Sequence, residues 1–503
     1  MATGGKYGAG IGGGTGSTGS GGIVTINGGT VTAIGGEGGA GIGGGKNGVG
    51  ATVTINGGTV TATAGEDAEA IGKGNSGGSS GDLIFGEGVN FAIKAGENEA
   101  GATDTDATTF SGSHSAAYVH IEVDNSVKFM RWDSVNKKLV EDKTTEYTEV
   151  TSSTTTLDAG KFYVVKGADV KTGTLTVNGT AAEPTTLILA DGAKLTAQGG
   201  QDKAGINVAS DKALIITTPK DGTGVLEATG GSRGAGIGGD YSGTSGAVTI
   251  NGGTIIANGG NNSAGIGGGQ RGAGAIVTIN GGSVTAKGES YGAGIGGGEY
   301  GAGGTVTING GTVIATGGMC GAGIGGGSEG DGGNVTINGG SVTVTAGKNA
   351  EAIGKGNSGT DSGTVTFGEG VSFTIKAGAD KDNTSSKTAS EYATSHSAAY
   401  VEIKQTTVAD IASEVSGWDD GTATEIDMSY TGGNLVITNN EVSPTQTISL
   451  PGTTVLTASG DNWTCTENGV TYTFAMSAGR LMSVTVVSVP ANEAVDVKYA
   501  LYE

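Results

Sequence analysis

The sequence predicts an all-β protein whose main part is a parallel β-helix with coils of 29 residues. Three observations predict this fold. A V-T-I-N-G-G hexad recurs at a fixed step, apolar and polar residues alternate within each copy, and Gly or Asn-Gly closes each short apolar run. A fixed period of this length is typical of stacked repeats, because one copy cannot bury its own apolar face. The hexads start at Val24, Val53, Val248, Val277, Val306 and Val335.

One copy contains three short runs with a period of two. In the copy that begins at Val277, Val277 and Ile279 flank Thr278, and the same alternation returns at 284–286 and 293–295. A period of two indicates a strand with one buried face, and Gly and Asn tolerate the backbone of the bends between strands. We therefore expect three strands per coil, in coils that we expect to be right-handed, with identical side chains stacked in columns.

Composition excludes several classes of protein. The chain has 503 residues, of which 105 are Gly and 5 are Pro. The strict phase of Val and Ile argues against a disordered Gly-rich chain, and Gly does not recur every third residue as collagen requires. A net charge of −22 and only four Arg argue against a nucleic-acid partner. No run of 18 apolar residues predicts a membrane span.

Departures from the repeat divide the chain into three parts. The G-A-G-I-G-G-G motif changes to A-E-A-I-G-K-G at 68–74 and again at 350–356, as expected of terminal coils that must close an open apolar end. We predict a truncated solenoid with a C-terminal cap at 1–123, and an N-terminal cap, second solenoid and C-terminal cap at 124–404. Residues 405–503 should form a β-rich, sandwich-like domain.

Details at the two ends extend this prediction. The chain begins in mid-repeat, so we interpret it as a fragment that lacks its native signal peptide. In the last part, Asn468-Gly469 lies between two alternating runs and predicts a hairpin. Residues 408–415 are a candidate short helix.

The chain also resembles a known group of proteins. The order W-D, D-A-G-K-F-Y-V-V, L-I-L-A-D-G-A-K-L-T-A and then repeated G-A-G-I-G-G-G and V-T-I-N-G-G-T-V-T-A is similar to that of large secreted or surface proteins of gut Firmicutes. Those proteins are often labelled carbohydrate-binding-domain or pectin-lyase-like β-helix proteins. The resemblance covers about residues 1–404 and implies a bacterial cell-surface or extracellular setting and glycan binding. It assigns no binding residues, and a fold alone does not fix a function.

Catalytic constellations are weak in this sequence. Glycoside hydrolysis needs two carboxylates at a set separation, whereas the acids of the regular coils fall at scattered bend positions, and Arg233 and Arg271 also lie in bends. Solvated loop charges are the better interpretation, so we expect no enzyme. A polysaccharide lyase or hydrolase stays as an alternative. The acids considered are Glu37, Asp240, Glu289, Glu299, Glu329 and Asp331.

Cofactor and metal sites are likewise not expected. His114 and His396 are equivalent residues of the two S-H-S-A-A-Y segments, which points to a structural hydrogen bond in each cap. Cys320 and Cys465 are too few for a disulfide framework and should be free thiols. The Gly-rich turns lack the Asp of known calcium-binding repeats. Calcium needs only oxygen ligands, so calcium binding at the acidic loops 66–69 and 97–106 stays an alternative. The column of Asn in the hexads is interpreted as structural, because stacked amides bond from coil to coil.

Four tyrosines are the best candidates for contact with a ligand. Tyr7 and Tyr291 precede the G-A-G-I motif, and Tyr241 and Tyr300 follow it, at bends where side chains leave the stack. Aromatic rings at such positions can stack on sugar faces. We therefore predict a non-catalytic surface protein that uses its solenoid for adhesion or for binding a polysaccharide or surface glycan. A passive stalk is the further alternative.

Overall fold

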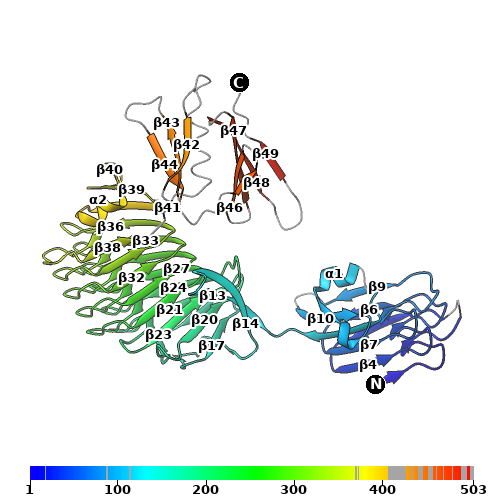
Figure 1. Cartoon of the computed structure of the whole chain (residues 1–503). Coiled ribbons are helices and arrows are strands. Elements are labelled where there is room, and N and C mark those ends of the chain that lie inside the picture. The colour runs from blue at the N-terminus through cyan, green and yellow to red at the C-terminus, as the bar shows by residue number, and fades with distance from the viewer. Residues whose placement is uncertain are drawn as a thin grey trace. The chain divides into compact units, whose positions relative to one another are not determined.

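The computed structural model describes residues 1–16, 19–86, 89–112, 115–368, 371 and 373–405, and the backbone of eight strands between 426 and 498. The chain divides into two compact units, Met1–Ser126 and Val127–Glu503. Each unit contains stacked coils with three parallel strands per coil (Figure 1). Strands pair with their counterparts 29 residues away in the regular coils, as in Val277↔Val306. The predicted parallel β-helix with 29-residue coils is therefore confirmed.

Each coil contributes to three sheets, which we name after their sequences. The hexad sheet contains the V-T-I-N runs, the T-V-T-A sheet the runs that follow them, and the Ile-Gly sheet the two-residue strands of the G-A-G-I-G-G-G motif. Val277 and Ile279 are buried whereas Thr278 between them is not. Inward side chains of successive coils therefore form one continuous core, as a stacked repeat requires.

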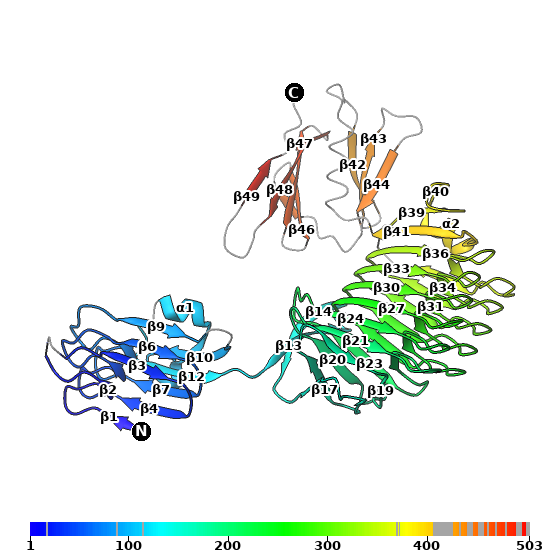
Figure 2. The same cartoon turned by 180° about the vertical axis from the view of Figure 1, so that it is seen from behind.

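The first unit has the shorter stack (Figure 2). Its T-V-T-A sheet is closed by three strands that run antiparallel, with a 3-10 turn between the first and second of them in the chain and a short helix, α1, between the second and third. The elements are β1 Ala2–Thr3, β2 Ile11–Gly12, β3 Ile23–Ile26, β4 Thr30–Ile34, β5 Ile42–Gly43, β6 Thr52–Ile55, β7 Thr59–Thr63, β8 Ile71–Gly72, β9 Asp82–Phe85, β10 Phe91–Gly96, η1 Glu99–Gly101, β11 Thr103–Thr105, α1 Ala107–Gly112 and β12 Tyr118–Val123.

The second unit stacks more coils in the same three sheets. Its hexad sheet contains β15 Thr148–Glu149, β17 Phe162–Val165, β20 Thr185–Leu189, β23 Ala213–Thr217, β26 Ala247–Ile250, β29 Ile276–Ile279, β32 Thr305–Ile308, β35 Asn334–Ile337 and β38 Thr364–Phe367. Its Ile-Gly sheet contains β16 Thr156–Leu157, β19 Leu175–Val177, β22 Ile206–Asn207, β25 Ile237–Gly238, β28 Ile266–Gly267, β31 Ile295–Gly296, β34 Ile324–Gly325 and β37 Ile353–Gly354.

The T-V-T-A sheet of the second unit ends as that of the first does. After the parallel strands, the chain returns antiparallel along the last of them, and helix α2 follows the final hairpin strand. The elements are β18 Val170–Thr172, β21 Lys194–Gln198, β24 Val225–Thr229, β27 Thr254–Asn258, β30 Ser283–Lys287, β33 Thr312–Thr316, β36 Ser341–Thr345, β39 Phe373–Gly378, β40 Thr384–Lys387, α2 Ala389–Thr394 and β41 Tyr400–Gln405.

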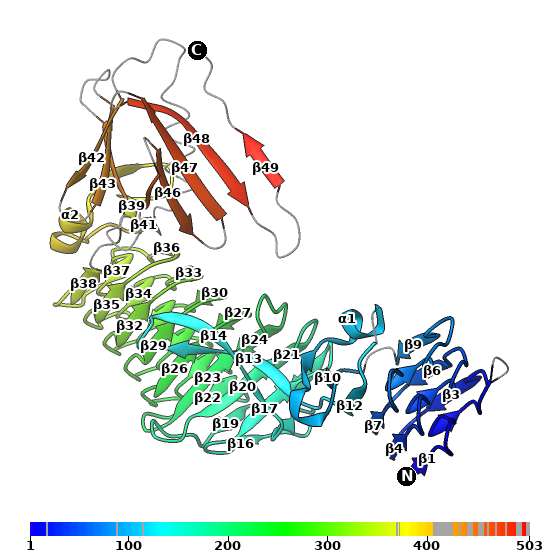
Figure 3. The same ribbon diagram turned by 45° about the vertical axis from the view of Figure 1, so that its right-hand side comes forward.

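A hairpin lies across the outside of the hexad sheet of the second unit (Figure 3). Its strands are β13 Val127–Asp133 and β14 Lys138–Thr144, within the stretch expected to be an N-terminal cap. Phe129 packs on Val164 and Ile188, two buried residues of the sheet. This arrangement hides apolar side chains that point away from the core of the coils.

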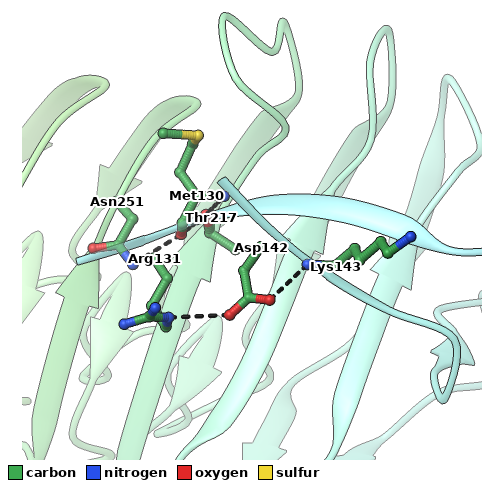
Figure 4. Close-up of polar contacts among 6 residues, drawn as sticks. All are labelled: Met130, Arg131, Asp142, Lys143, Thr217 and Asn251. Carbon is green, nitrogen blue, oxygen red and sulfur yellow. Dashed lines mark hydrogen bonds and ion pairs between the residues drawn. The ribbon is translucent and has the colours of Figure 1, made fainter. Parts of the chain in front are cut away.

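Backbone groups fasten this hairpin to the coils (Figure 4). The Met130 N–H donates to the carbonyl of Thr218 at 2.8 Å. The Met130 carbonyl accepts from Thr217 Oγ1 at 2.7 Å and from Asn251 Nδ2 at 3.2 Å. The hairpin itself is closed by an ion pair between Arg131 and Asp142, 3.0 Å apart. The hairpin therefore caps the first amide of the Asn column.

The Asn column forms the ladder that its spacing predicts. Asn280 Nδ2 donates to Asn251 Oδ1 at 2.8 Å, Asn309 to Asn280 at 2.7 Å, and Asn338 to Asn309 at 2.7 Å. In the first unit Asn56 donates to Asn27 in the same way. The structural interpretation of this column is confirmed.

The C-terminal part of the second unit contains antiparallel strands. Strands β46 and β47 pair in a register that ends at Glu467↔Val470, so the hairpin predicted at Asn468-Gly469 is confirmed. The candidate helix at 408–415 lies outside the described residues. The strands are β42 Ile426–Thr431, β43 Asn434–Asn439, β44 Gln446–Leu450, β45 Thr457–Ser459, β46 Asn462–Glu467, β47 Val470–Ser477, β48 Arg480–Ser488 and β49 Val495–Lys498.

Candidate functional site

Two turns flank every Ile-Gly strand, and their tips lie side by side. A backbone bond joins the turn before one strand to the turn after the next: Gln270 N–H donates to Arg233 O at 3.0 Å, and Glu299 N–H donates to Asn262 O at 2.8 Å. We call the continuous row of these tips in the second unit the turn ridge. It begins with the turn at residues 199–204 and ends with the turn at residues 357–358. It is the surface where the sequence varies most between coils, because the stack does not require these side chains.

Three of the four predicted tyrosines lie on the turn ridge. Tyr291 belongs to a turn before an Ile-Gly strand, and Tyr241 and Tyr300 belong to turns after one. The backbone of Ser328 joins two of them, because its N–H donates to Tyr291 O at 2.7 Å and its carbonyl accepts from Tyr300 N–H at 2.8 Å. The structure therefore brings Tyr291 and Tyr300 together as neighbours on one surface.

Tyr241 contacts Arg233, a residue that the sequence alone suggested was only a solvated loop charge. The guanidinium carbon of Arg233 lies 4.0 Å from the centre of the Tyr241 ring, a cation–π contact. Arg233 is in turn fixed by Asp202 through two hydrogen bonds, each 2.6 Å long. The hydrogen bond to Arg233 lowers the pKa of the Asp202 carboxyl. A bidentate pair of this kind orients the guanidinium, so it also orients the ring beneath it.

Tyr300 lies at the tip of its turn in a left-handed backbone conformation. Its φ is 64° and half of the residue is exposed. Such a φ is rare for a large residue and persists only where the surroundings impose it. Arg271, in the preceding coil, lies 5.7 Å from the ring centre. The Glu299 carboxylate, followed by that of Glu329, raises the pKa of the Tyr300 phenol.

Tyr7 occupies the corresponding type of turn in the first unit, apart from the other three. The ammonium groups of Lys6 and Lys46 lie 5.1 and 5.0 Å from its ring centre. An association of a tyrosine ring with a cation therefore recurs in both units. The signal that could have revealed these contacts is the coil period, because Arg271 precedes Tyr300 by 29 residues and Lys46 belongs to the coil after Tyr7.

The acidic side chains of the ridge are mostly engaged by the protein itself. Asp240 accepts from Lys203 Nζ at 2.7 Å, from Ala204 N–H at 2.8 Å and from Asn207 Nδ2 at 2.9 Å. Glu299 accepts from Gln270 Nε2 at 2.7 Å. These bonds tie neighbouring turns together.

The acidic segments considered for calcium have local roles. Asp106 accepts from Thr109 N–H and Thr109 Oγ1 at the start of α1, and Glu69 accepts from Lys73 N–H and Ser80 Oγ. Within the described ranges, no group of three His, Cys, Asp or Glu side chains is arranged to hold a metal ion. A cavity of about 730 Å³ beside Glu69 at the end of the first unit is lined by serines and Asp82.

The predicted cap histidine is described in the second unit only. His396 is buried, and its Nδ1 lies 3.0 Å from the carbonyl oxygen of Ile353, so the structural hydrogen bond predicted there is confirmed. His114 lies outside the described residues, as does the side chain of Cys465. Cys320 is a free thiol. No helix in the described part is long and apolar enough to cross a membrane.

Comparisons with known proteins agree with this architecture. A family profile described as "Beta helix repeat" matches residues 24–46, 53–80, 248–270, 277–299 and 306–328. Each match begins at the first Val of a hexad, and together they span both units. Neither a search of curated proteins nor a search of solved structures gave a match. The matched segments of the chain therefore carry β-helix repeats.

Proposed function

We propose that the protein is a non-catalytic extracellular surface protein of a bacterium that binds a glycan through its turn ridge. The observation that carries this proposal is the row of Tyr241, Tyr291 and Tyr300 on one face of the second unit, with Arg233 fixed against the first of them. Stacking of aromatic rings on the apolar faces of sugars needs rings that are exposed and immobilised. The sequence resemblance to surface proteins supports the same setting.

The state of the carboxylates favours binding over hydrolysis or elimination. A general acid needs a raised pKa, whereas the hydrogen bond from Arg233 lowers the pKa of Asp202. The Asp240 carboxylate is engaged by three donors of the protein itself. These two acids of the ridge are therefore better suited to orient neighbouring groups than to protonate a glycosidic oxygen.

Affinity electrophoresis against a panel of neutral and acidic polysaccharides tests this proposal. We expect retention of the full chain without release of reducing or ultraviolet-absorbing products, and we expect the retention to be lost in a variant carrying both Tyr241→Ala and Tyr300→Ala. Met319→Ala is the matched control, because Met319 is an exposed, non-aromatic residue of the same ridge. Calcium and chelator are compared in parallel.

The other outcomes separate the alternatives. Products in the reaction mixture would establish a lyase or hydrolase and overturn the non-catalytic proposal. Absence of both retention and products over the whole panel would favour a passive stalk. Retention that survives the double substitution would place glycan binding away from the turn ridge.

A further inference from the structure

We infer that the turn ridge takes a single linear, uncharged glycan chain that lies along the axis of the solenoid and contacts Tyr241 and, two coils further on, Tyr300 and Tyr291. This inference rests on the proposed function and specifies the ligand of the same site. Three features carry it: the axial spacing of the tyrosines, the area of them that stays exposed, and the charge around Tyr300.

The spacing follows from the backbone bonds between tips. Ser242 N–H donates to Gln270 O, Arg271 N–H to Glu299 O, and Tyr300 N–H to Ser328 O, each bond advancing one coil. The tip with Tyr241 is therefore two coils from the tip with Tyr300, roughly 10 Å at the usual strand spacing.

Tyr291 lies level with Tyr300 along this row. The two residues flank the same strand, β31, and both are bonded to Ser328 in the next coil. The three tyrosines therefore span about two strand spacings, roughly 10 Å. That length is on the scale of a few consecutive sugar rings, and a branched or globular ligand would not follow it.

The arginines leave part of Tyr241 and of Tyr300 exposed for a ligand. Arg233 lies over Tyr241 at 4.0 Å, yet 36% of Tyr241 stays exposed. Tyr300 is 50% exposed beside Arg271. Each tyrosine therefore keeps exposed area although an arginine lies beside its ring. A sugar ring can stack there without displacing the arginine.

The charges around Tyr300 disfavour a polyanion. Glu299 and Glu329 lie close enough to act on the phenol, against the single cation of Arg271. Arg233, the other arginine of the ridge, is already neutralised by Asp202. A chain of uronic acids or sulfated sugars would bring like charge to this surface, whereas hydroxyl groups can donate to the carboxylates and accept from amides such as Gln270.

Isothermal titration of the full chain with linear glucose and mannose oligomers of one to six residues, and with oligogalacturonates of the same lengths, tests this inference. We expect affinity for at least one neutral series to rise by roughly fivefold for each ring contacted, and to level off after three or four residues. Tyr241→Ala, which removes the ring at one end of the row, should shorten the length at which affinity levels off, and Met319→Ala should leave it unchanged. Thermal melting verifies that each variant is folded.

Three results would overturn the inference while leaving the proposed function intact. They are preferential binding of oligogalacturonates, equal affinity for one and for six neutral residues, and an unchanged length dependence in folded Tyr241→Ala. Failure of every polysaccharide in the affinity panel, by contrast, would defeat the proposed function itself and this inference with it.

Discussion

Glu351 accepts a hydrogen bond from the backbone N–H of Lys355 at 3.1 Å, at the point where the stack of Ile-Gly strands ends. In the coil before, the equivalent N–H of Gly326 donates to the carbonyl of Gly354 at 2.9 Å. Lys355 has no following coil, so the carboxylate of Glu351 supplies the missing acceptor. Its second oxygen accepts from Ser362 Oγ at 2.8 Å.

The same replacement closes the first unit. Glu69 accepts from Lys73 N–H at 2.9 Å and from Ser80 Oγ at 2.7 Å. The change from G-A-G-I-G-G-G to A-E-A-I-G-K-G at both ends therefore has a physical cause. It converts an open sheet edge into a satisfied one, which protects a solenoid from adding further strands.

Glu351→Ala should destabilise the end of the second solenoid by about 2 kcal/mol, because it leaves the half-buried Lys355 N–H and the Ser362 hydroxyl without their acceptor. Glu351→Gln should cost less than about 1 kcal/mol, because its amide oxygen can accept from Lys355 while its NH₂ group donates to Ser362. The midpoint of thermal unfolding compares the two variants.

Hydrogen exchange supplies the local measurement. The amide of Lys355 should exchange faster in Glu351→Ala than in the wild type and should stay protected in Glu351→Gln. Equal loss of protection in both variants would mean that the charge of Glu351, rather than its hydrogen bonds, closes the sheet.

Gly296→Ala should be among the most damaging single substitutions in the regular coils, at about 3 kcal/mol or more. Gly296 has a φ of 141°, and a Cβ there would lie 1.9 Å from the carbonyl oxygen of Gly325. Gly200→Ala is the matched control, because a Cβ at Gly200 would meet nothing within 4 Å. We expect that control to melt within a few degrees of the wild type, and similar melting of both variants would contradict the packing described for the Ile-Gly sheet.

The 29-residue period predicted how the coils stack, but it did not predict the side-chain contacts between turns of neighbouring coils. Val277, Thr278 and Asn280 could be placed because their roles repeat in every coil and follow from strand alternation. The stack of Arg233 on Tyr241 occurs once, and it depends on side-chain directions within turns that no repeat constrains. The contact of Arg271 with Tyr300 could have been predicted, because the two residues are 29 positions apart and so occupy equivalent places in successive coils.

The hairpin at residues 127–144 lies outside the 29-residue repeat, so the repeat could not predict where it packs. Its strands have aromatic and apolar residues, which suggested a cap over the end of the core, whereas Phe129 packs on the outside of the hexad sheet. The cause is that Val164 and Ile188 are apolar at the position where the next coils have Thr217 and then Asn251, the first residue of the Asn column. An outward apolar residue in the first coils was the signal that something covers this face.

Asn280→Ala should destabilise the second unit more than Asn338→Ala does. Asn280 is a middle member of the ladder, and its loss leaves Asn251 Oδ1 and Asn309 Nδ2 without partners. Asn338 makes one ladder bond, to Asn309. With each unpaired buried group costing about 1 kcal/mol or more, we expect roughly 2 and 1 kcal/mol in denaturant unfolding. Equal costs at the two positions would show that the ladder does not act through its pairwise bonds.

The pH dependence of the ridge is set by the pair of Asp202 and Arg233. Hydrogen bonding to Arg233 lowers the pKa of Asp202 in the folded protein. A carboxyl whose folded pKa lies below its unfolded value contributes stability above the unfolded pKa, and this contribution is lost as the pH falls through the folded pKa. The contact between Arg233 and Tyr241 should therefore persist from neutral pH to below the ordinary range of an Asp carboxyl.

Carboxyl NMR of chain labelled at Asp measures this directly. In Arg233→Gln the pKa of Asp202 should rise toward its ordinary value, and the stabilising contribution of the carboxylate should disappear at every pH. The carboxyl of Asp211, whose pKa is lowered by its own neighbour Lys212, is the internal control and should not move. If Asp202 titrates normally in the wild type, or keeps its lowered pKa in Arg233→Gln, then Arg233 does not fix the ring of Tyr241 through this pair, and the orientation of the ridge must have another source.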